Sequence, residues 1–300
     1  MNISADGTKR LKGGLHIHTD KSDGRKSSAE ATELYRSAGY DFIAITDHWV
    51  YNPGSRSDGI TVLSGIEYDI GSDVQGGIFH IVGIGCSEDP GFTRSSLTMT
   101  GSLQQTQYVI DHINGTGGAA ILAHPAWSMN RAGDILRLRG LAGIEIYNAI
   151  SGMPWGRRAD SSVILDMLAV DGFMLPLHAA DDTHYYTEET GNCCIWAEVS
   201  ETSEVSEALL IDAIKNGRLY ASRGPLLEIE RKHNTFYVTC SPVSSIVFQT
   251  GTPWIADRVT RADGLTHAEY TIKPSDLFVR IEAVDAEGKR AWSGYYSPEI

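Results

Sequence analysis

Two histidines give the first sign of chemistry in this chain. His16 and His18 stand one residue apart at the end of a short apolar run, residues 11–17. In an extended strand, side chains two residues apart point to the same face, so these imidazoles are expected to project side by side. A Ser-Asp-Gly turn follows and carries the carboxylate of Asp23. This combination favours a divalent metal ion, although two ordinary strand histidines would give the same pattern.

Similar side chains recur downstream, at or near the ends of apolar segments. The full set of candidate metal ligands is His16, His18, Asp23, His48, Glu67, His80, His124, Asp182 and His184. A single catalytic zinc takes about three protein ligands, and this set is too large for one such ion. We therefore expect two or three divalent ions (zinc, manganese or iron), with positions left open for water and substrate. The alternative is a group of unrelated polar residues.

The elements that must position these side chains alternate between strand and helix over the first 220 residues. Residues 27–30, Ser-Ser-Ala-Glu, form a capping box and predict a helix that ends near Gly39. Predicted strands cover 40–46, 62–66, 78–84, 119–123, 143–147, 173–179 and 195–199, and further helices cover 102–114, 158–170 and 205–216. This alternation is typical of a parallel sheet covered by helices. Because so many strands carry a candidate ligand near their carboxyl ends, a closed or nearly closed β/α barrel is favoured over an open sheet.

The pattern changes after Arg223-Gly224-Pro225. Short predicted strands follow at 226–230, 235–239, 245–248, 268–272 and 278–284, without a helical pattern between them. We therefore expect an α/β barrel domain over residues 1–224 and a small antiparallel β unit over residues 225–300.

Composition limits the classes of function. With 300 residues, 42% of them hydrophobic, the chain can bury a sizeable core. The net charge of −13 and the lack of a dense basic run argue against a long nucleic-acid partner. No apolar stretch reaches the length of a membrane span, and the polar N-terminus does not resemble a signal peptide. The four cysteines lack disulfide or zinc-finger spacing, so a cytoplasmic protein is expected, of undetermined oligomeric state.

Six motifs, in this order, resemble those of the PHP (polymerase and histidinol phosphatase) superfamily over residues 13 to about 220. They are His16-x-His18-Thr19 with Ser22-Asp23-Gly24, Thr46-Asp47-His48, Gly65-Ile66-Glu67, His80-Ile81-Val82-Gly83, Ala123-His124-Pro125 and Asp182-x-His184. The resemblance implies a distorted (β/α)7 TIM-like barrel with a di- or trinuclear metal centre that hydrolyses phosphate esters. Asp23 stands where histidinol phosphatases have a histidine. The ending, residues 216–225 followed by the β-rich tail, is similar to that of the carbaryl-hydrolase-like branch.

By motif position, the resemblance also implies which residues bind each ion. The first ion would take His16, His18, Glu67 and Asp182; the second Glu67, His80 and His124; the third Asp23, His48 and His184. Glu67 would then bridge two ions, and Glu67, Asp182 and His184 are the residues expected to carry the catalysis.

The leading hypothesis is a phosphoesterase that cleaves a small phosphomonoester by means of a metal-activated hydroxide. Three divalent ions would outweigh the carboxylates Asp23, Glu67 and Asp182, which suits a dianionic substrate. Alternatives are a metallohydrolase of a carbamate, amide or ester, and a catalytically silent metal-binding protein. Candidate partners of the phosphate are Lys21, Arg131, Arg157, Arg158 and Arg223, and Trp127 and Trp155 are candidates for the walls of a pocket.

Overall fold

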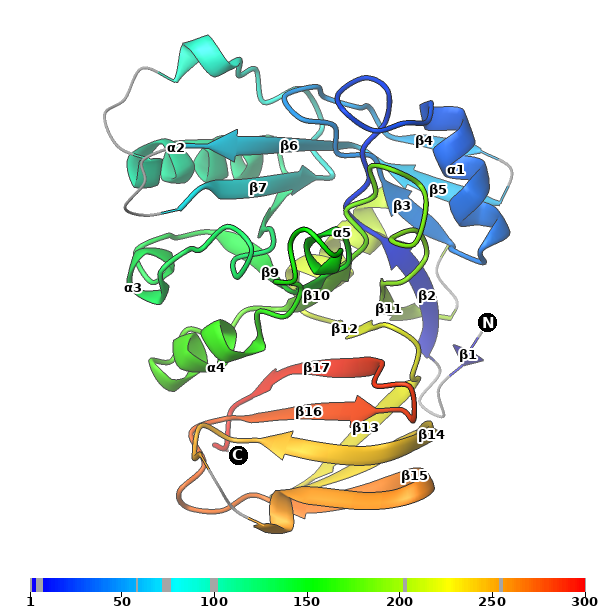
Figure 1. Cartoon of the computed structure of the whole chain (residues 1–300), viewed down its shortest axis with the longest axis vertical. Helices are drawn as coiled ribbons and strands as arrows, with labels where there is room; N and C mark the ends of the chain where they lie inside the picture. Colours follow the sequence, from blue (N-terminus) through cyan, green and yellow to red (C-terminus); the bar gives the residue numbers. More distant parts are fainter. Residues whose placement is uncertain are drawn as a thin grey trace.

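The strands of the protein form two sheets, which Figure 1 shows in a computed structural model that describes residues 2–3, 8–57, 59–71, 77–97, 102–201, 204–253 and 256–299. The smaller sheet has five strands in the order β10-β9-β8-β7-β6. Their bounds are β6 Gly65–Ile70, β7 Phe79–Ile84, β8 Ala119–Leu122, β9 Leu141–Asn148 and β10 Leu177–Ala180.

The larger sheet runs in the order β13-β14-β16-β17-β12-β11-β2-β3-β5-β4, and β1 and β15 pair with β2 and β14. Its N-terminal strands are β1 Asn2–Ile3, β2 Thr8–Gly14, β3 Phe42–Ala44, β4 Ser55–Ser57 and β5 Ile60–Leu63. The remaining strands are β11 Cys194–Ser200, β12 Leu219–Ser222, β13 Leu227–Lys232, β14 Thr235–Gln249, β15 Val259–Thr271, β16 Val279–Val284 and β17 Arg290–Tyr296.

Two isolated parallel bridges join the sheets. Ile17, which follows β2, pairs with Thr183, which follows β10. His48, which follows β3, pairs with Glu67 of β6. The carboxyl ends of β2 and β3 are thereby held against both edges of the smaller sheet, and the segments that carry the candidate ligands converge there.

Helices pack on the sheets through one apolar face each. α1 (Ser28–Ser37) begins with the predicted capping box, because Ser27 and Glu30 bond each other's backbone N–H groups, and it ends just before Gly39. α2 (Ser102–Gly115) buries a stripe spaced by three and four residues, Thr106, Val109, Ile110 and Ile113. The other helices are α3 Ala132–Ile135, α4 Ser162–Val170 and α5 Glu207–Lys215, with 3-10 turns η1 Arg94–Ser96, η2 Ile150–Gly152 and η3 Ala256–Arg258. None of the described helices is long and apolar enough to span a bilayer.

The expectation of a parallel sheet is wrong for part of the chain. β8, β9 and β10 are parallel, but β7 is antiparallel to both β6 and β8. Residues 71–78, which connect β6 to β7, are fewer than the dozen or so that a crossover between parallel strands needs. The strand predicted over 62–66 is also divided: β5 ends at Leu63 and β6 begins at Gly65 in the other sheet. A Cβ at Gly65 would lie 2.4 Å from the carbonyl oxygen of Ile45, so only glycine fits this change of sheet.

The C-terminal strands continue the larger sheet, because β17 pairs with β12. They gather at one end of the molecule, drawn from yellow to red in Figure 1. The predicted strands at 235–239 and 245–248 form one strand, β14, with register shifts between Thr239 and Ser245. The pattern did not predict β17. The chain is thus a mixed α/β fold whose β-rich tail packs on the α/β part.

Candidate metal centre

The structure gathers all nine predicted ligands in the region where the two sheets meet. Six strands or the turns after them supply these residues: His16, His18 and Asp23 follow β2, His48 follows β3, Glu67 and His80 lie in β6 and β7, His124 follows β8, and Asp182 and His184 follow β10. Eight of them form three overlapping groups whose ligand atoms are mutually close enough to hold an ion, and His124 lies outside these groups.

The first group is buried and has the distances of a metal site. Glu67 Oε2 lies 3.1 Å from His16 Nε2 and 3.0 Å from His18 Nε2. Asp182 Oδ1 lies 3.2 Å and 3.1 Å from the same two nitrogens. A tetrahedron with ligands about 2.0 Å from zinc has edges of about 3.3 Å. None of these four atoms has a hydrogen-bond partner among the described residues, so a cation fits this site.

The second group places Glu67 between His48 and His80. Glu67 Oε1 lies 2.8 Å from His80 Nδ1, and Glu67 Oε2 lies 3.3 Å from His48 Nδ1. His124 is near but more distant: its Nε2 lies 3.7 Å from Glu67 Oε1 and from Asp182 Oδ2. The motif-based assignment put His124 here and His48 with the third ion. The distances instead place His48 in both the second and the third group. Which of the two histidines binds the second ion stays a prediction.

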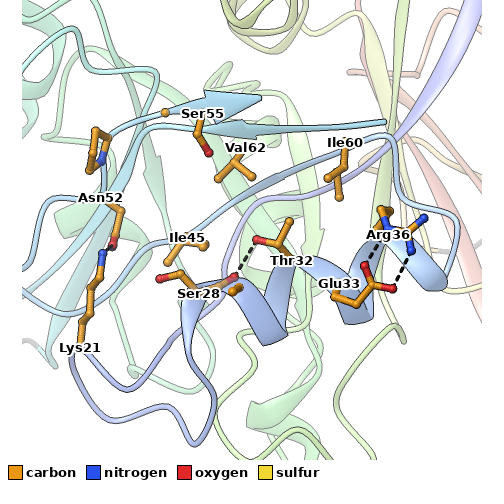
Figure 2. A pocket seen from close by; sticks show the side chains of 13 residues that line it. Lys21, Ser28, Thr32, Glu33, Arg36, Ile45, Asn52, Ser55, Ile60 and Val62 are labelled. Carbon is orange, nitrogen blue, oxygen red and sulfur yellow. Dashed lines mark hydrogen bonds and ion pairs between the residues drawn. The ribbon is translucent and has the colours of Figure 1, made fainter. Parts of the chain in front are cut away.

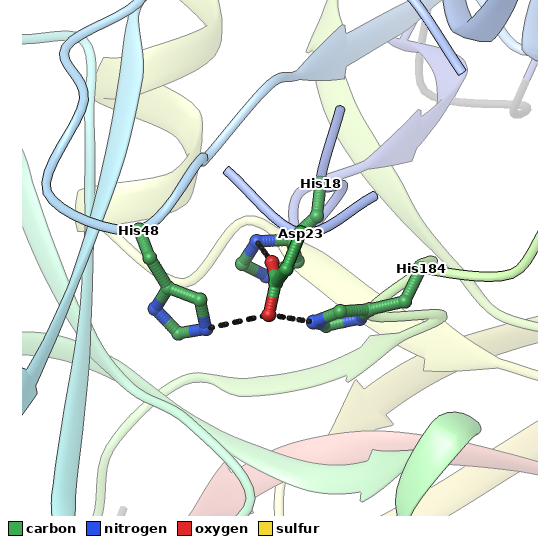
Figure 3. A group of neighbouring side chains, drawn as sticks. All are labelled: His18, Asp23, His48 and His184. Carbon is green, nitrogen blue, oxygen red and sulfur yellow. Dashed lines mark ion pairs between the residues drawn. The ribbon is translucent and has the colours of Figure 1, made fainter. Parts of the chain in front are cut away.

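The third group is open to solvent and is shown in Figure 3. Asp23 Oδ2 lies 3.5 Å from His184 Nε2 and 4.0 Å from His48 Nε2, and Asp23 Oδ1 lies 3.6 Å from His18 Nδ1. The Asp23 side chain is 55% exposed, whereas the carboxylates of the first group are buried. A substrate would therefore reach the cluster from this side.

Hydrogen bonds to Asp47 hold the turn that carries Asp23. Asp47 is buried and accepts hydrogen bonds from the Thr19 backbone N–H at 2.6 Å, the Thr19 hydroxyl at 2.7 Å and the Ser22 hydroxyl at 2.8 Å. A Cβ at Gly24 would lie 2.3 Å from the carbonyl oxygen of His18, which requires glycine in this turn.

The histidines and carboxylates shift each other's protonation. Burial alone lowers the pKa of His18, but the nearby carboxylates of Asp182 and Glu67 outweigh it and raise that pKa to about 9. Burial opposes ionisation of Glu67 and Asp182, yet the surrounding histidines, His16 foremost, hold the pKa of both carboxyls well below its usual range. Without metal, protons thus take the place between imidazole and carboxylate that divalent ions would occupy.

Two supporting residues were not predicted from the sequence. Glu145 of β9 is buried, and its Oε1 lies 2.8 Å from His16 Nδ1. Its Oε2 accepts hydrogen bonds from the His124 backbone N–H and from Asn148 Nδ2, and the latter also donates to Asp182 Oδ2 at 3.1 Å. A carboxylate that fixes the other nitrogen of a ligand imidazole orients the ring. The signal in the sequence that could have identified Glu145 is a lone glutamate within an apolar strand.

Asp182 and His124 themselves have positive φ angles, 53° and 29°. Such backbone conformations cost about 1–3 kcal/mol each in residues other than glycine and concentrate at functional sites. The surrounding contacts hold both side chains in the cluster despite this cost.

Two hollows lie near the cluster but do not coincide with it. One, of about 720 Å³, runs between α1 and β5, with Ile45, Ile60 and Val62 among its lining residues (Figure 2). Here Lys21 Nζ donates to Asn52 Oδ1 at 2.7 Å. The other, of about 600 Å³, is lined by Trp155 and by Tyr185, which directly follows His184 in the sequence. Of the other predicted phosphate partners, Arg223 stacks 4.3 Å from the centre of the Tyr147 ring.

The chain was compared with known protein families, sequences and solved structures. No family model matches the chain. An uncharacterized protein of Methanocaldococcus jannaschii is 28% identical over 151 residues, which are 46% of this chain and 82% of that protein. A solved two-domain protein of Bacteroides vulgatus, described as containing a predicted PHP-like metal-dependent phosphoesterase, superposes with a TM-score of 0.53 and 18% identity over 99% of this chain and 97% of that one. An amidohydrolase of Chromobacterium violaceum has a TM-score of 0.44 and 17% identity, over 69% of this chain and 96% of that one. The chain thus shares the fold of the two-domain PHP-like protein.

Proposed function

We propose that this chain is a metal-dependent phosphoesterase of the PHP superfamily that hydrolyses a small phosphomonoester. One observation carries the proposal: five buried polar atoms face one another without hydrogen-bond partners among the described residues. They are His16 Nε2, His18 Nε2, His48 Nδ1, Glu67 Oε2 and Asp182 Oδ1. Burying unpaired polar atoms is costly, and bound cations would offset that cost.

The residues suit two or three divalent ions, of zinc, manganese or iron. His16, His18, Glu67 and Asp182 would hold the first; Glu67 and His80, with His48 or His124, the second; Asp23, His48 and His184 the third. When bound, such ions supply a nucleophilic water at neutral pH and stabilise charge on the transferring phosphoryl group. We assign Glu67, Asp182 and His184 as the residues closest to the reaction, because Asp182 Oδ1 of the buried group lies 3.5 Å from His184 Nδ1 of the open group and Glu67 belongs to two of the groups.

The fold assignment that accompanies this proposal is a distorted (β/α)7 TIM-like barrel over residues 1–224 and a small β domain over 225–300. The ring of β2, β3 and β6 to β10, closed by the bridges at Ile17 and His48, supports the barrel interpretation. The carbaryl-hydrolase-like ending supports placement in that branch, and it keeps carbamates among the substrates to be tested.

A substrate panel tests the proposal. Purified protein supplemented with manganese, zinc or iron is assayed on p-nitrophenyl phosphate, sugar phosphates, nucleoside phosphates and aryl carbamates. We expect metal-dependent phosphate release that a chelator abolishes. His80→Asn should lower kcat about 100-fold, whereas His233→Asn, in a β13–β14 turn with positive φ that asparagine tolerates, should not change it. Hydrolysis of carbamates without phosphate release would overturn the proposal in favour of the metallohydrolase alternative.

A further inference from the structure

Two residues that line the hollow of about 600 Å³ belong to the segments that carry the open group of candidate ligands. Its walls are Arg25, Met153, Trp155, Tyr185, Thr187 and Glu188. Tyr185 directly follows His184, and Arg25 lies two residues after Asp23. The backbone N–H of Arg25 donates to the carbonyl oxygen of His184 at 2.8 Å, which fixes these two segments side by side. A substrate whose phosphate reached Asp23 and His184 would therefore extend into this hollow.

Two aromatic side chains form a corner in the hollow. The ring centroids of Trp155 and Tyr185 are 5.6 Å apart, and their planes meet at 82°. The Arg25 guanidinium lies 4.7 Å from the Tyr185 ring centroid and covers that ring. Trp155 remains 64% exposed. An exposed indole beside a second aromatic edge offers a flat apolar group both a stacking surface and an edge-to-face contact.

Both walls are anchored to the candidate ligands, so the corner is preformed. On one side, buried Glu189 accepts hydrogen bonds from the backbone N–H groups of Tyr185 and Tyr186, both at 2.6 Å. The Tyr186 hydroxyl then donates to the carbonyl oxygen of His18 at 2.5 Å. A fixed wall loses little conformational entropy when a ligand binds.

On the Trp155 side, the anchor is Asn148. Its Oδ1 accepts the backbone N–H of Ser151 at 3.1 Å, and its Nδ2 donates to Asp182 Oδ2 at 3.1 Å. The turn that carries Trp155 is closed by Gly156 N–H, which donates to the carbonyl oxygen of Met153 at 2.8 Å. This wall is therefore tied to a carboxylate of the buried group.

The charges of the hollow select an uncharged group. Arg25 and Glu188 are its two charged side chains, and their formal charges cancel. The hollow thus lacks the positive excess that a second phosphate would require. From this geometry we infer that the hollow binds the planar aromatic leaving group of an aryl phosphomonoester. Trp155 is then the residue that selects aryl over alkyl substrates. This inference rests on the proposed function, since the phosphate is placed at the metal centre.

Binding of two inert phosphonates tests the inference without turnover. Metal-supplemented protein is titrated calorimetrically with phenylphosphonate and methylphosphonate. The wild type should bind phenylphosphonate about tenfold more tightly, as expected for one stacked ring. Trp155→Ala should abolish that difference, and Trp155→Phe should keep most of it. Tyr237→Ala, an exposed aromatic on β14, is the control and should bind both ligands as the wild type does.

Kinetics separate this inference from the proposed function. Trp155→Ala should raise KM for phenyl phosphate about tenfold and leave ethyl phosphate within about twofold. Turnover of both esters without an aryl preference, or an equal loss for both in Trp155→Ala, overturns the subsite and leaves the phosphoesterase standing. The protein could instead bind phenylphosphonate, lose that binding only in Trp155→Ala, and turn over neither ester. This result supports the subsite and overturns the phosphomonoester reaction. Failure to bind either phosphonate overturns the subsite.

Discussion

Glu67 lies at the centre of the cluster because each of its two oxygens faces a different set of imidazoles. Oε2 lies within about 3 Å of the Nε2 atoms of His16 and His18, and Oε1 lies 2.8 Å from His80 Nδ1. The side chain is buried and has a depressed pKa, so it carries its charge at neutral pH. A carboxylate whose two oxygens face different imidazoles is suited to bridge two cations.

Replacing this carboxylate by an amide tests the bridge. Glutamine offers one carbonyl oxygen and no charge, so Glu67→Gln should empty or separate the first two ion sites and lower kcat by about 100-fold or more. Asp23→Asn, the matched change in the open group, should affect KM more than kcat. The measurements are kcat, KM and metal stoichiometry of both variants. Near-normal turnover and a full metal complement in Glu67→Gln would refute the bridge, and greater damage from Asp23→Asn would place the nucleophile nearer the third ion.

His178 is a buried histidine of a different kind. Both its ring nitrogens lack hydrogen-bond partners among the described residues, and burial lowers its pKa to about 4. A Cβ at Gly143 would lie 2.2 Å from His178 Nε2, so the ring packs directly against the backbone of β9. The chain therefore folds around a neutral imidazole here.

Acid should destabilise the protein through this residue. The unfolded histidine titrates near pH 6.5. Between about pH 6.5 and 4 the unfolded state therefore binds a proton and the native state does not, so stability falls as the pH falls. Between pH 7.5 and 5 the loss is about 2 kcal/mol. His178→Leu leaves no hydrogen-bond partner unsatisfied. Over the same pH change this variant should lose about 2 kcal/mol less stability than the wild type loses. Urea unfolding of both proteins with chelator at the two pH values measures the difference, and equal losses would contradict the assignment.

At the residue scale, the nine candidate ligands could be predicted because each lies in a short motif with its own residue types. Glu145 and Asn148 could not, since their roles depend on partners distant in the sequence. His16 and Glu145 are separated by 129 positions, and nothing in either segment specifies that they meet. The pairing follows only from the way β2 and β9 come together in space.

At the scale of elements, the sequence predicted those features that contacts between nearby residues determine. The start of α1 follows from Ser27 and Glu30, which are three residues apart and bond to each other. The merger of two predicted strands into β14 depends on partner strands instead. Strand pairing in the tail is set by neighbours, so the sequence predicted its β character but not its order.

The contact between α4 and the tail is an element-scale prediction. Arg280 of β16 is buried and donates through Nε and Nη2 to Asp166 Oδ1 at 2.9 Å and Oδ2 at 2.8 Å, and Tyr295 donates to the same carboxylate. Asp166→Ala leaves a buried guanidinium with the weaker partner Glu282, 3.2 Å away. We expect a loss of about 3 kcal/mol in unfolding free energy.

Chemical denaturation of Asp166→Ala measures this loss. Asp212→Ala, which removes an exposed pair with Arg218, is the matched control and should change stability by at most about 1 kcal/mol. Metal content should stay unchanged in both variants, because neither aspartate belongs to the candidate metal centre. An unfolding midpoint of Asp166→Ala equal to that of the control would show that the tail is held by its strand pairing and apolar contacts alone.

At the scale of the whole molecule, the candidate metal centre connects the two sheets. Its ligands follow β2 and β3 in the larger sheet and β8 and β10 in the smaller one, or lie within β6 and β7. Besides the two backbone bridges at Ile17 and His48, these side chains link the facing ends of the sheets. Bound ions should therefore stabilise the fold and not only the site. Because β12 and β17 join the tail to the same sheet, this effect should reach the C-terminal strands.

Metal-linked stability tests this connection. Elemental analysis of supplemented protein should find two or three transition-metal ions per chain, and a chelator should lower the thermal midpoint. Ions that bind only the folded state stabilise it by about 2.7 kcal/mol at a hundredfold excess over Kd, and by about 1.4 kcal/mol more for each further tenfold. Glu67→Gln should lose this dependence, whereas His233→Asn should retain it. If the active protein contains no more than one ion, or if its midpoint is the same with and without chelator, the centre does not hold the two sheets together.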